Sequence, residues 1–307
     1  MNKIEKSLVT GGAGFIGSNL VDRLVEIGHK VIVLDNFVSG KKVNLSHHKK
    51  KNVKIIKLDI SENKNLDKYF KKVDYVFHLA GLAEIIPSIK NPKKYFKNNV
   101  LGTYKVIEAS KKAKIKKFIY AASSSCYGTP KNYPTSEKDK IDTKNPYALT
   151  KYLGEELVMS YASVFNMPNI SFRFFNVYGP RLNNSSQYSS VFGIFLLQKS
   201  ANKPLTIIGK GNQTRDFIHV DDLINAFIKT IKSKSANKVY NLGSGKETSI
   251  NKIAGLMGGK KTFIPKRRGE PNRSCANISK IKKDIKWRPK VTIEEGVRRL
   301  LKNINYF

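Results

Sequence analysis

Residues 7–17 of the chain read SLVTGGAGFIG, and Ser18–Ile27 continue with apolar residues at helical spacing. The letters SLVT predict a short buried strand, the glycines predict a tight turn, and the rest predicts a helix that follows the turn. Glycines spaced G-x-x-G-x-x-G let the backbone approach a pyrophosphate, and a helix N-terminus supplies N–H donors. The stretch therefore predicts a dinucleotide site with contacts from Gly11, Gly14, Phe15, Ile16 and Gly17.

The second predicted strand, KVIVL at residues 30–34, ends at Asp35. A carboxylate at a strand end, about 20 residues after the glycine turn, binds the ribose 2′-hydroxyl and repels a 2′-phosphate. We therefore expect the cofactor to be NAD rather than NADP.

Three more predicted strands, Val53–Leu58, Val73–Phe77 and Lys117–Ala122, end in residues that suit a ligand site. Open parallel sheets bind their ligands at the carboxyl ends of the strands. The expected contacts are Asp59 and Ile60 at the adenine, and Leu79, Ala80 and Gly81 beneath the cofactor.

His78 and the hydroxyl groups after the third of these strands each allow two interpretations. His78 could ligate a metal, but no other His, Cys or carboxylate stands at ligand spacing, so we expect a hydrogen-bonded structural histidine and no metal site. Ser123, Ser124 and Ser125 could form a polar turn, but beside a nicotinamide their hydroxyls would face a substrate.

Tyr147 and Lys151 follow Pro146, which suits the first turn of a helix. Four residues apart, the two side chains should share one helix face. An ammonium beside a phenol favours the phenolate, so Lys151, helped by the cationic nicotinamide ring, should lower the pKa of Tyr147 from ~10 toward ~7. The pair predicts a proton-transfer group that acts next to the nicotinamide. Alone, the pattern also fits an ordinary surface helix.

Charge is the compositional feature that fits least, because the 307 residues carry a net charge of +34. Such a charge suits nucleic acid or another anion, but scattered lysines are more typical of compositional bias. Arginine is more informative, since several arginines lie in the segments Arg173–Arg181, Arg215 and Arg267–Arg273, where they could grip a pyrophosphate. Two cysteines and the lack of a long apolar stretch predict a cytoplasmic protein without membrane insertion.

Together the motifs resemble the extended short-chain dehydrogenase/reductase family, and within it the UDP-sugar 4-epimerases. The segments that carry the resemblance are TGGAGFIG, Asp35, HLAG, KNNVLGT, SSSCYG, Tyr147-x-x-x-Lys151, FRFFNVYGPR, GNQTRDFIHVDDL, VYNLGSG and RRGEPNRSCANISK. The resemblance covers nearly the whole chain. It implies an NAD-dependent enzyme with a catalytic Ser, Tyr and Lys set.

The resemblance also assigns individual residues. Ser123 is the implied catalytic serine, Ser124 remains an alternative, and Ser125 is expected to face the substrate. Further NAD contacts are implied at Asn36, Phe37, Ser39, Gly40, Asn99 and Phe175. Substrate contacts are implied at Asn176, Arg215, Arg268, Glu270, Arg273 and Ser274, and the implied assembly is a homodimer.

The chain departs from two neighbouring branches of the family at the serine segment. Sugar 4,6-dehydratases carry an Asp-Glu pair where Ser124 and Ser125 stand, because they need an acid and a base to eliminate water. UDP-glucuronate decarboxylases carry a glutamate nearby. Epimerisation needs oxidation, reorientation and reduction only, and this residue set suits it.

Alternating strands and helices up to Phe175 predict an α/β fold with a doubly wound parallel sheet. We expect an NAD-binding Rossmann domain at residues 1–175, with a return segment at 215–243. A smaller substrate domain is expected at 176–214 and 244–307, including a loop over the substrate at Asn183–Ser190. Later elements are predicted at Ser190–Ser200, Leu205–Ile208, Val220–Ile231 and Val239–Leu242.

The expected activity is inversion of the C4 hydroxyl of a UDP-sugar through a 4-keto intermediate, with NAD kept bound. Ser274 is small where epimerases restricted to UDP-glucose and UDP-galactose carry a tyrosine, which suggests that 2-acetamido sugars are accepted. The alternatives are another NAD-dependent nucleotide-sugar enzyme (a reductase, dehydratase or decarboxylase) and a catalytically silent relative that binds RNA.

Overall fold

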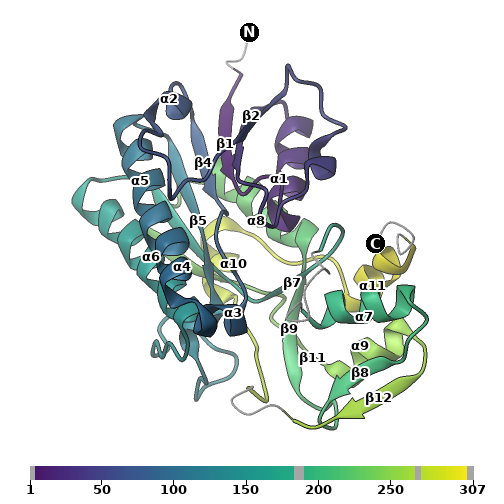
Figure 1. Ribbon diagram of the computed structural model, residues 1–307. Helices are drawn as coiled ribbons and strands as arrows, with labels where there is room; N and C mark the ends of the chain where they lie inside the picture. The colour runs from purple at the N-terminus through teal and green to yellow at the C-terminus, as the bar shows by residue number, and fades with distance from the viewer. Residues whose placement is uncertain (1–3, 183–189, 267–270, 303–307) are drawn as a thin grey trace.

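The computed structural model describes residues 4–182, 190–266 and 271–302. Its largest element is a seven-stranded sheet in the order β10-β6-β5-β4-β1-β2-β3, in which every pair of neighbours is parallel. Helices lie on both sides of this sheet (Figure 1). The doubly wound α/β fold that the sequence predicts is confirmed.

The strands are β1 (Lys6–Thr10), β2 (Lys30–Asp35), β3 (Val53–Lys57), β4 (Tyr75–His78), β5 (Lys117–Ser123), β6 (Asn169–Phe174), β7 (Asn176–Tyr178), β8 (Leu205–Ile208), β9 (Thr214–His219), β10 (Lys238–Leu242), β11 (Glu247–Ser249) and β12 (Lys261–Ile264). The α-helices are α1 (Phe15–Glu26), α2 (Asp67–Phe70), α3 (Ile85–Lys90), α4 (Pro92–Phe96), α5 (Gly102–Lys112), α6 (Pro146–Val164), α7 (Val191–Ser200), α8 (Val220–Lys232), α9 (Ile250–Met257), α10 (Ser279–Ile285) and α11 (Ile293–Lys302). The other helical turns are η1 (Lys42–Leu45), η2 (Lys97–Leu101) and η3 (Ser124–Tyr127).

Two apolar cores sandwich the large sheet. Leu20 of α1 and Phe227 of α8 belong to the core on one face. Val106 of α5 and Val158 of α6 belong to the core on the other. Strands β4 and β5 are buried along their whole length, as expected of parallel strands covered on both faces.

A smaller body adjoins the carboxyl edge of the large sheet (Figure 1). It contains a three-stranded sheet, β11-β9-β7, and a two-stranded sheet, β12-β8. Helices α7, α9 and α11 enclose a third core that includes Phe195, Ile253 and Leu300. The site is therefore expected between this body and the strand ends of the large sheet.

Three details differ from the sequence-based expectations. Helix α1 begins at Phe15 rather than Ser18, because Gly14 is already its N-cap. Strand β4 begins at Tyr75, two residues later than predicted. The indole of Trp287 is fully buried in the core of the large sheet and donates to the Asp222 carbonyl at 3.0 Å, so residues near 287 pack there and not in the smaller body.

Among the described residues, no helix combines the length and the apolar character that crossing a membrane requires.

Candidate active site

The turn between β1 and α1, here called the glycine cradle, packs so closely against backbone that side chains would collide with it. Gly11 has φ +68°, and a Cβ on it would stand 2.8 Å from the Ala80 backbone nitrogen. A Cβ on Gly17 would lie 2.1 Å from the Gly11 carbonyl oxygen. No side chain caps the start of α1 at Gly14, so the first N–H groups of the helix suit an anion. The cradle fits the pyrophosphate of a dinucleotide.

Asp35 lies at the end of β2 and is buried under the segment that follows it. Its carboxylate accepts the N–H of Ala13 at 2.9 Å and the N–H of Phe37 at 2.8 Å. A Cβ on Gly40 would stand 2.9 Å from either carboxylate oxygen, which explains the glycine there. Each oxygen retains a lone pair that a ribose hydroxyl could use.

Asn36 and Asp59 join the ends of β2 and β3. The Asn36 side-chain amide donates to the Asp59 carboxylate at 2.8 Å, and Ser61 donates to the same group through both its backbone and its hydroxyl. Burial raises the pKa of Asp59, but these hydrogen bonds outweigh it and hold the pKa below its usual value. The structure thus brings the predicted adenine contacts to the same edge as Asp35.

His78 and Asn99 are structural groups under the loop that follows β4. The His78 ring is fully buried between the hydroxyls of Thr10 (2.7 Å) and Thr103 (2.9 Å), and burial lowers its pKa to about 3. Asn99 accepts the Leu82 N–H at 2.8 Å and donates to the Leu82 carbonyl at 3.1 Å. The prediction of a structural His78 is confirmed, and Asn99 fixes the backbone near Gly81.

Tyr147 and Lys151 both lie on α6, which starts at Pro146 as predicted and is capped by the Asn145 side chain. The Lys151 ammonium stands 4.5 Å from the centre of the Tyr120 ring, and it would lie 3.7 Å from a Cβ on Gly81. The Tyr147 N–H donates to the Ser88 hydroxyl at 3.1 Å. Helix α6 therefore carries the Lys151 ammonium to the loop after β4, and the Tyr147 backbone is fastened to α3.

The pKa of Tyr147 differs in direction from the sequence-based prediction. Burial raises the pKa of the Tyr147 phenol, and a hydrogen bond with Ser123 only partly opposes this. Burial also lowers the pKa of Lys151 to about 7, although Glu155 opposes the shift. The prediction counted the charges of Lys151 and of a bound nicotinamide ring and left out desolvation, which is the dominant effect for both side chains in the cofactor-free protein.

The three serines after β5 occupy different positions. Ser123 is buried, hydrogen-bonds to Tyr147, and accepts the Ser125 N–H at 3.2 Å. Ser124 and Ser125 are only partly buried and lie in η3. Ser123 is thus the serine that the structure brings to the tyrosine.

The predicted substrate contacts lie around β9 and β11. Arg215 is on β9, opposite Thr248 of β11, and its guanidinium donates to the Thr214 carbonyl at 2.9 Å. Arg273 lies 4.8 Å above the Tyr133 ring and makes a two-pronged ion pair with Glu247, with distances of 3.0 and 2.6 Å. Arg273 is thus paired with the residue that precedes Thr248, the strand partner of Arg215.

The structure gives fewer contacts for the other predicted substrate residues. The Asn176 side-chain amide donates to the Asp216 carbonyl at 3.1 Å. Ser274 is partly buried in the segment before Cys275. Arg268, Glu270 and most of the expected loop at Asn183–Ser190 lie outside the described residues.

Two arginines that the sequence offered for a pyrophosphate have other partners. Arg173 is buried on β6, where it pairs with Glu155 at 2.6 Å and donates to the Tyr127 hydroxyl at 2.8 Å. Arg181 pairs with Asp22 of α1 at 2.7 Å. Arg173 was wrong as a candidate, because its guanidinium is buried against Glu155, a pairing that sequence proximity to a motif does not reveal.

Asp216 is a site-forming residue that the sequence reasoning missed. Its buried carboxylate accepts the N–H groups of Ser244, Gly245 and Ala276 at 2.6, 2.9 and 3.0 Å. It thereby ties β9, the strand that carries Arg215, to the loop after β10 and to the chain after Ser274. A carboxylate directly after Arg215 in RDFIH was the available signal.

The chain is similar to known proteins in both sequence and structure. The sequence profile of the NAD-dependent epimerase/dehydratase family matches residues 7–243. A UDP-glucose 4-epimerase of Mycolicibacterium smegmatis is 34% identical over 312 residues, which is 98% of each chain. The structure of a UDP-N-acetylglucosamine 4-epimerase of Methanobrevibacter ruminantium, bound to UDP-N-acetylmuramic acid, superimposes with a TM-score of 0.95 at 34% identity, covering 99% of this chain and 100% of that one. A UDP-glucose 4-epimerase of Thermotoga maritima, bound to UDP-glucose, has a TM-score of 0.92 at 32% identity, covering 98% and 99%.

Proposed function

Because the chain belongs to the NAD-dependent epimerase/dehydratase family, we propose that it is a UDP-sugar 4-epimerase. The membership confirms the resemblance that the motifs indicated, and NAD is the family's cofactor. The observation that carries the activity is the interaction of the buried Ser123 hydroxyl with the partly buried Tyr147 phenol, whose pKa it lowers, at the carboxyl edge of the sheet. The pair would supply a proton acceptor and a donor for the sugar 4-oxygen, at the edge of the sheet that also carries the glycine cradle.

Each group has a distinct part in the proposed reaction. When bound, NAD supplies the acceptance and return of a hydride at sugar C4. As the phenolate, which a charged Lys151 and a cationic nicotinamide ring would favour, Tyr147 takes the proton of the 4-hydroxyl and later gives it back. The Ser123 hydroxyl donates to the sugar 4-oxygen as it becomes a ketone. The 4-keto sugar turns about its pyrophosphate link between the two transfers.

Lys151 is proposed mainly to hold the cofactor ribose, because its side chain is not permanently charged near neutral pH. Its ammonium lies between the Tyr120 ring and the loop at Gly81, where a cofactor ribose is expected. With its pKa lowered to about 7, the side chain can donate to a ribose hydroxyl in either protonation state. In its charged form it favours the Tyr147 phenolate.

We assign the substrate pyrophosphate to Arg215 and Arg268, with Arg273 as a helper. Arg215 suits the part because β9 and the Asp216 hydrogen bonds fix its backbone. Arg273 is the weaker candidate, since it would have to exchange Glu247 for a phosphate. Glu270 and Asn176 are proposed as contacts to the nucleotide or the sugar.

Substrate size is the finer part of the proposal. A partly buried serine at position 274 leaves room for a 2-acetamido group, so both the N-acetylated and the unacetylated pairs should be interconverted. Ser274→Tyr should block UDP-N-acetylglucosamine selectively and spare UDP-glucose. Equal slowing of both pairs, or of neither, in a comparison of initial rates would remove Ser274 from the pocket.

We also propose a cytoplasmic homodimer. Large apolar side chains are exposed along α3 to α6 and the η2 turn between them, and such a surface suits a partner of the same kind. The exposed residues are Ile85, Ile86, Ile89, Phe96, Leu101, Tyr104, Leu149, Val164 and Phe165. Light scattering of the purified chain should give twice the monomer mass, and Ile89→Glu combined with Leu149→Glu should give the monomer.

A panel of UDP-sugars tests the activity. The purified chain should convert UDP-glucose, UDP-N-acetylglucosamine or UDP-glucuronate to the C4 epimer, separated by anion-exchange chromatography. Elimination or decarboxylation products would instead assign it to another branch of the family.

A further inference from the structure

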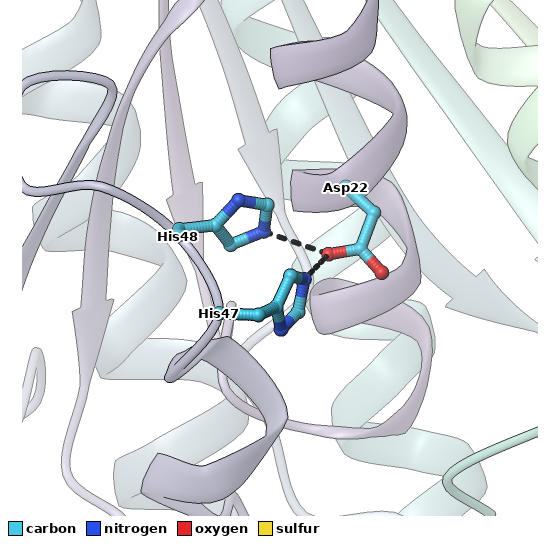
Figure 2. A group of neighbouring side chains, drawn as sticks. All are labelled: Asp22, His47 and His48. Carbon is cyan, nitrogen blue, oxygen red and sulfur yellow. Dashed lines mark hydrogen bonds and ion pairs between the residues drawn. The ribbon is translucent and has the colours of Figure 1, made fainter.

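We propose that Asp22, His47 and His48 bind a divalent transition-metal ion such as Zn²⁺, at a site separate from the expected substrate contacts. Asp22 projects from α1, and the two histidines follow η1 (Figure 2). The Nε2 atoms of His47 and His48 lie 2.9 and 2.7 Å from the same Asp22 Oδ1 atom. Three potential ligand atoms thus converge on one point.

The fold holds the two elements together independently of these side chains. The Asn44 side-chain amide and the Lys41 N–H both donate to the Ala13 carbonyl, at 2.9 and 3.0 Å. Leu45 is buried in the core that also contains α1. The loop therefore presents both imidazoles to Asp22 before any ion binds, which lowers the entropic cost of assembling the site.

The spacing of the donor atoms is close to that of a metal site. Zinc bonds of ~2.0–2.1 Å in tetrahedral geometry separate neighbouring ligand atoms by about 3.3 Å. Each histidine nitrogen must therefore move away from the carboxylate oxygen by only about half an ångström. A cation would replace the two N–H protons that the imidazoles otherwise direct at one oxygen.

The surroundings leave one carboxylate oxygen and one open side for the cation. Arg181 pairs with the other oxygen, Oδ2, at 2.7 Å and so orients Oδ1 toward the histidines. The His47 side chain is half exposed, which gives an ion access and leaves a coordination position for water. Two imidazoles favour zinc, nickel or copper over magnesium and calcium, which prefer oxygen ligands.

An ion in this site would fasten the segment that covers Asp35. The segment from Asn36 to His48 includes Gly40, which stands against the Asp35 carboxylate. Binding to the folded chain alone would raise the melting temperature with ion concentration. The proposed role is therefore stabilisation of the wall of the adenosine pocket.

Zinc titration by calorimetry tests the proposal on chelator-treated, untagged protein. The wild type should bind one Zn²⁺ and show no heat with Mg²⁺. Asp22→Asn and His47→Gln should each weaken Zn²⁺ binding at least ~10-fold. His47 is exposed, so its replacement should leave the fold intact. Asp67→Asn, which removes a carboxylate paired with Lys112 far from any of these imidazoles, should bind Zn²⁺ as the wild type does.

Arg181→Gln gives a second, opposite test. Loss of the guanidinium beside Oδ2 should tighten Zn²⁺ binding roughly twofold to fivefold, because a nearby positive charge disappears. Co²⁺ should give a visible absorption band in the wild type that Asp22→Asn abolishes. Equal Zn²⁺ affinity in the wild type and Asp22→Asn, or no binding by the wild type, would overturn the proposal.

Discussion

The cofactor side and the substrate side of the candidate site hold their polar groups differently. On the cofactor side, Asp35, Asn99 and Lys151 are buried and their partners are internal. On the substrate side, Arg273 is exposed and held by a surface ion pair with Glu247 and by a contact with the Tyr133 ring. The first region is organised by the fold, and we expect the second to acquire its final contacts from the ligand. Changes on the two sides should therefore affect different quantities.

The largest expected effect is on turnover. Tyr147→Phe removes only the proton acceptor, so kcat should fall ~10²–10⁴-fold while the fold and the bound NAD remain. Tyr152→Phe, on the same helix, is the matched control and should keep its activity. Near-normal turnover by Tyr147→Phe in the epimer assay would refute its role.

Burial on the cofactor side should cost stability in a pH-dependent way. Because burial lowers the pKa of Lys151 to about 7, the unfolded chain binds more protons than the folded chain from there up to the ordinary lysine pKa of ~10.4. The free energy of unfolding linked to Lys151 therefore rises with pH through this window. Below pH ~7 the folded chain carries the full cost of burying the ammonium.

Lys151→Met should accordingly stabilise the NAD-free fold by on the order of 3 kcal/mol at pH ~6, and by much less at pH ~10. Urea unfolding at the two pH values measures the difference. A gain of the same size at both would show that the ammonium is not desolvated.

On the substrate side, Arg215→Ala should raise KM for the UDP-sugar roughly tenfold, the loss of about one charged hydrogen bond. NAD content should not change, because the substitution lies outside the cofactor cradle. Arg288→Ala, which removes an exposed arginine elsewhere, is the control. An unchanged KM would remove Arg215 from the pyrophosphate.

The smallest expected effect is on the preference for NAD over NADP, on the cofactor side. NAD should bind more tightly than NADP, and Asp35→Ala should narrow the ratio of the two affinities roughly fivefold by removing a charge near the 2′-phosphate. Calorimetry with both cofactors measures the ratio. Equal affinities in the wild type would place Asp35 away from the ribose.

The sequence predicts best what local rules determine. The strand, turn and helix around Gly11–Gly17 follow from glycine spacing and periodicity, and Asp35 follows from its place at a strand end. Tyr147 and Lys151 lie on one helix because Pro146 and Asn145 start it. These parts of the cofactor side need no knowledge of distant contacts.

Distant pairings and burial were not predictable in this way. The Arg173–Glu155 pair and the meeting of Asp22 with His47 depend on how separate elements pack. Trp287 packs under the large sheet although it is remote from that sheet in sequence. The pKa of Tyr147 is raised because its phenol is desolvated, and no spacing rule reports desolvation.

Isotope retention at C4 tests the central claim most directly. A UDP-sugar carrying deuterium at C4 should give the C4 epimer with the deuterium still at C4, because the hydride that leaves this carbon returns to it. Mass spectrometry and proton NMR of the product measure this. Loss of the deuterium to water, or no C4 epimer from any UDP-sugar, would contradict the account.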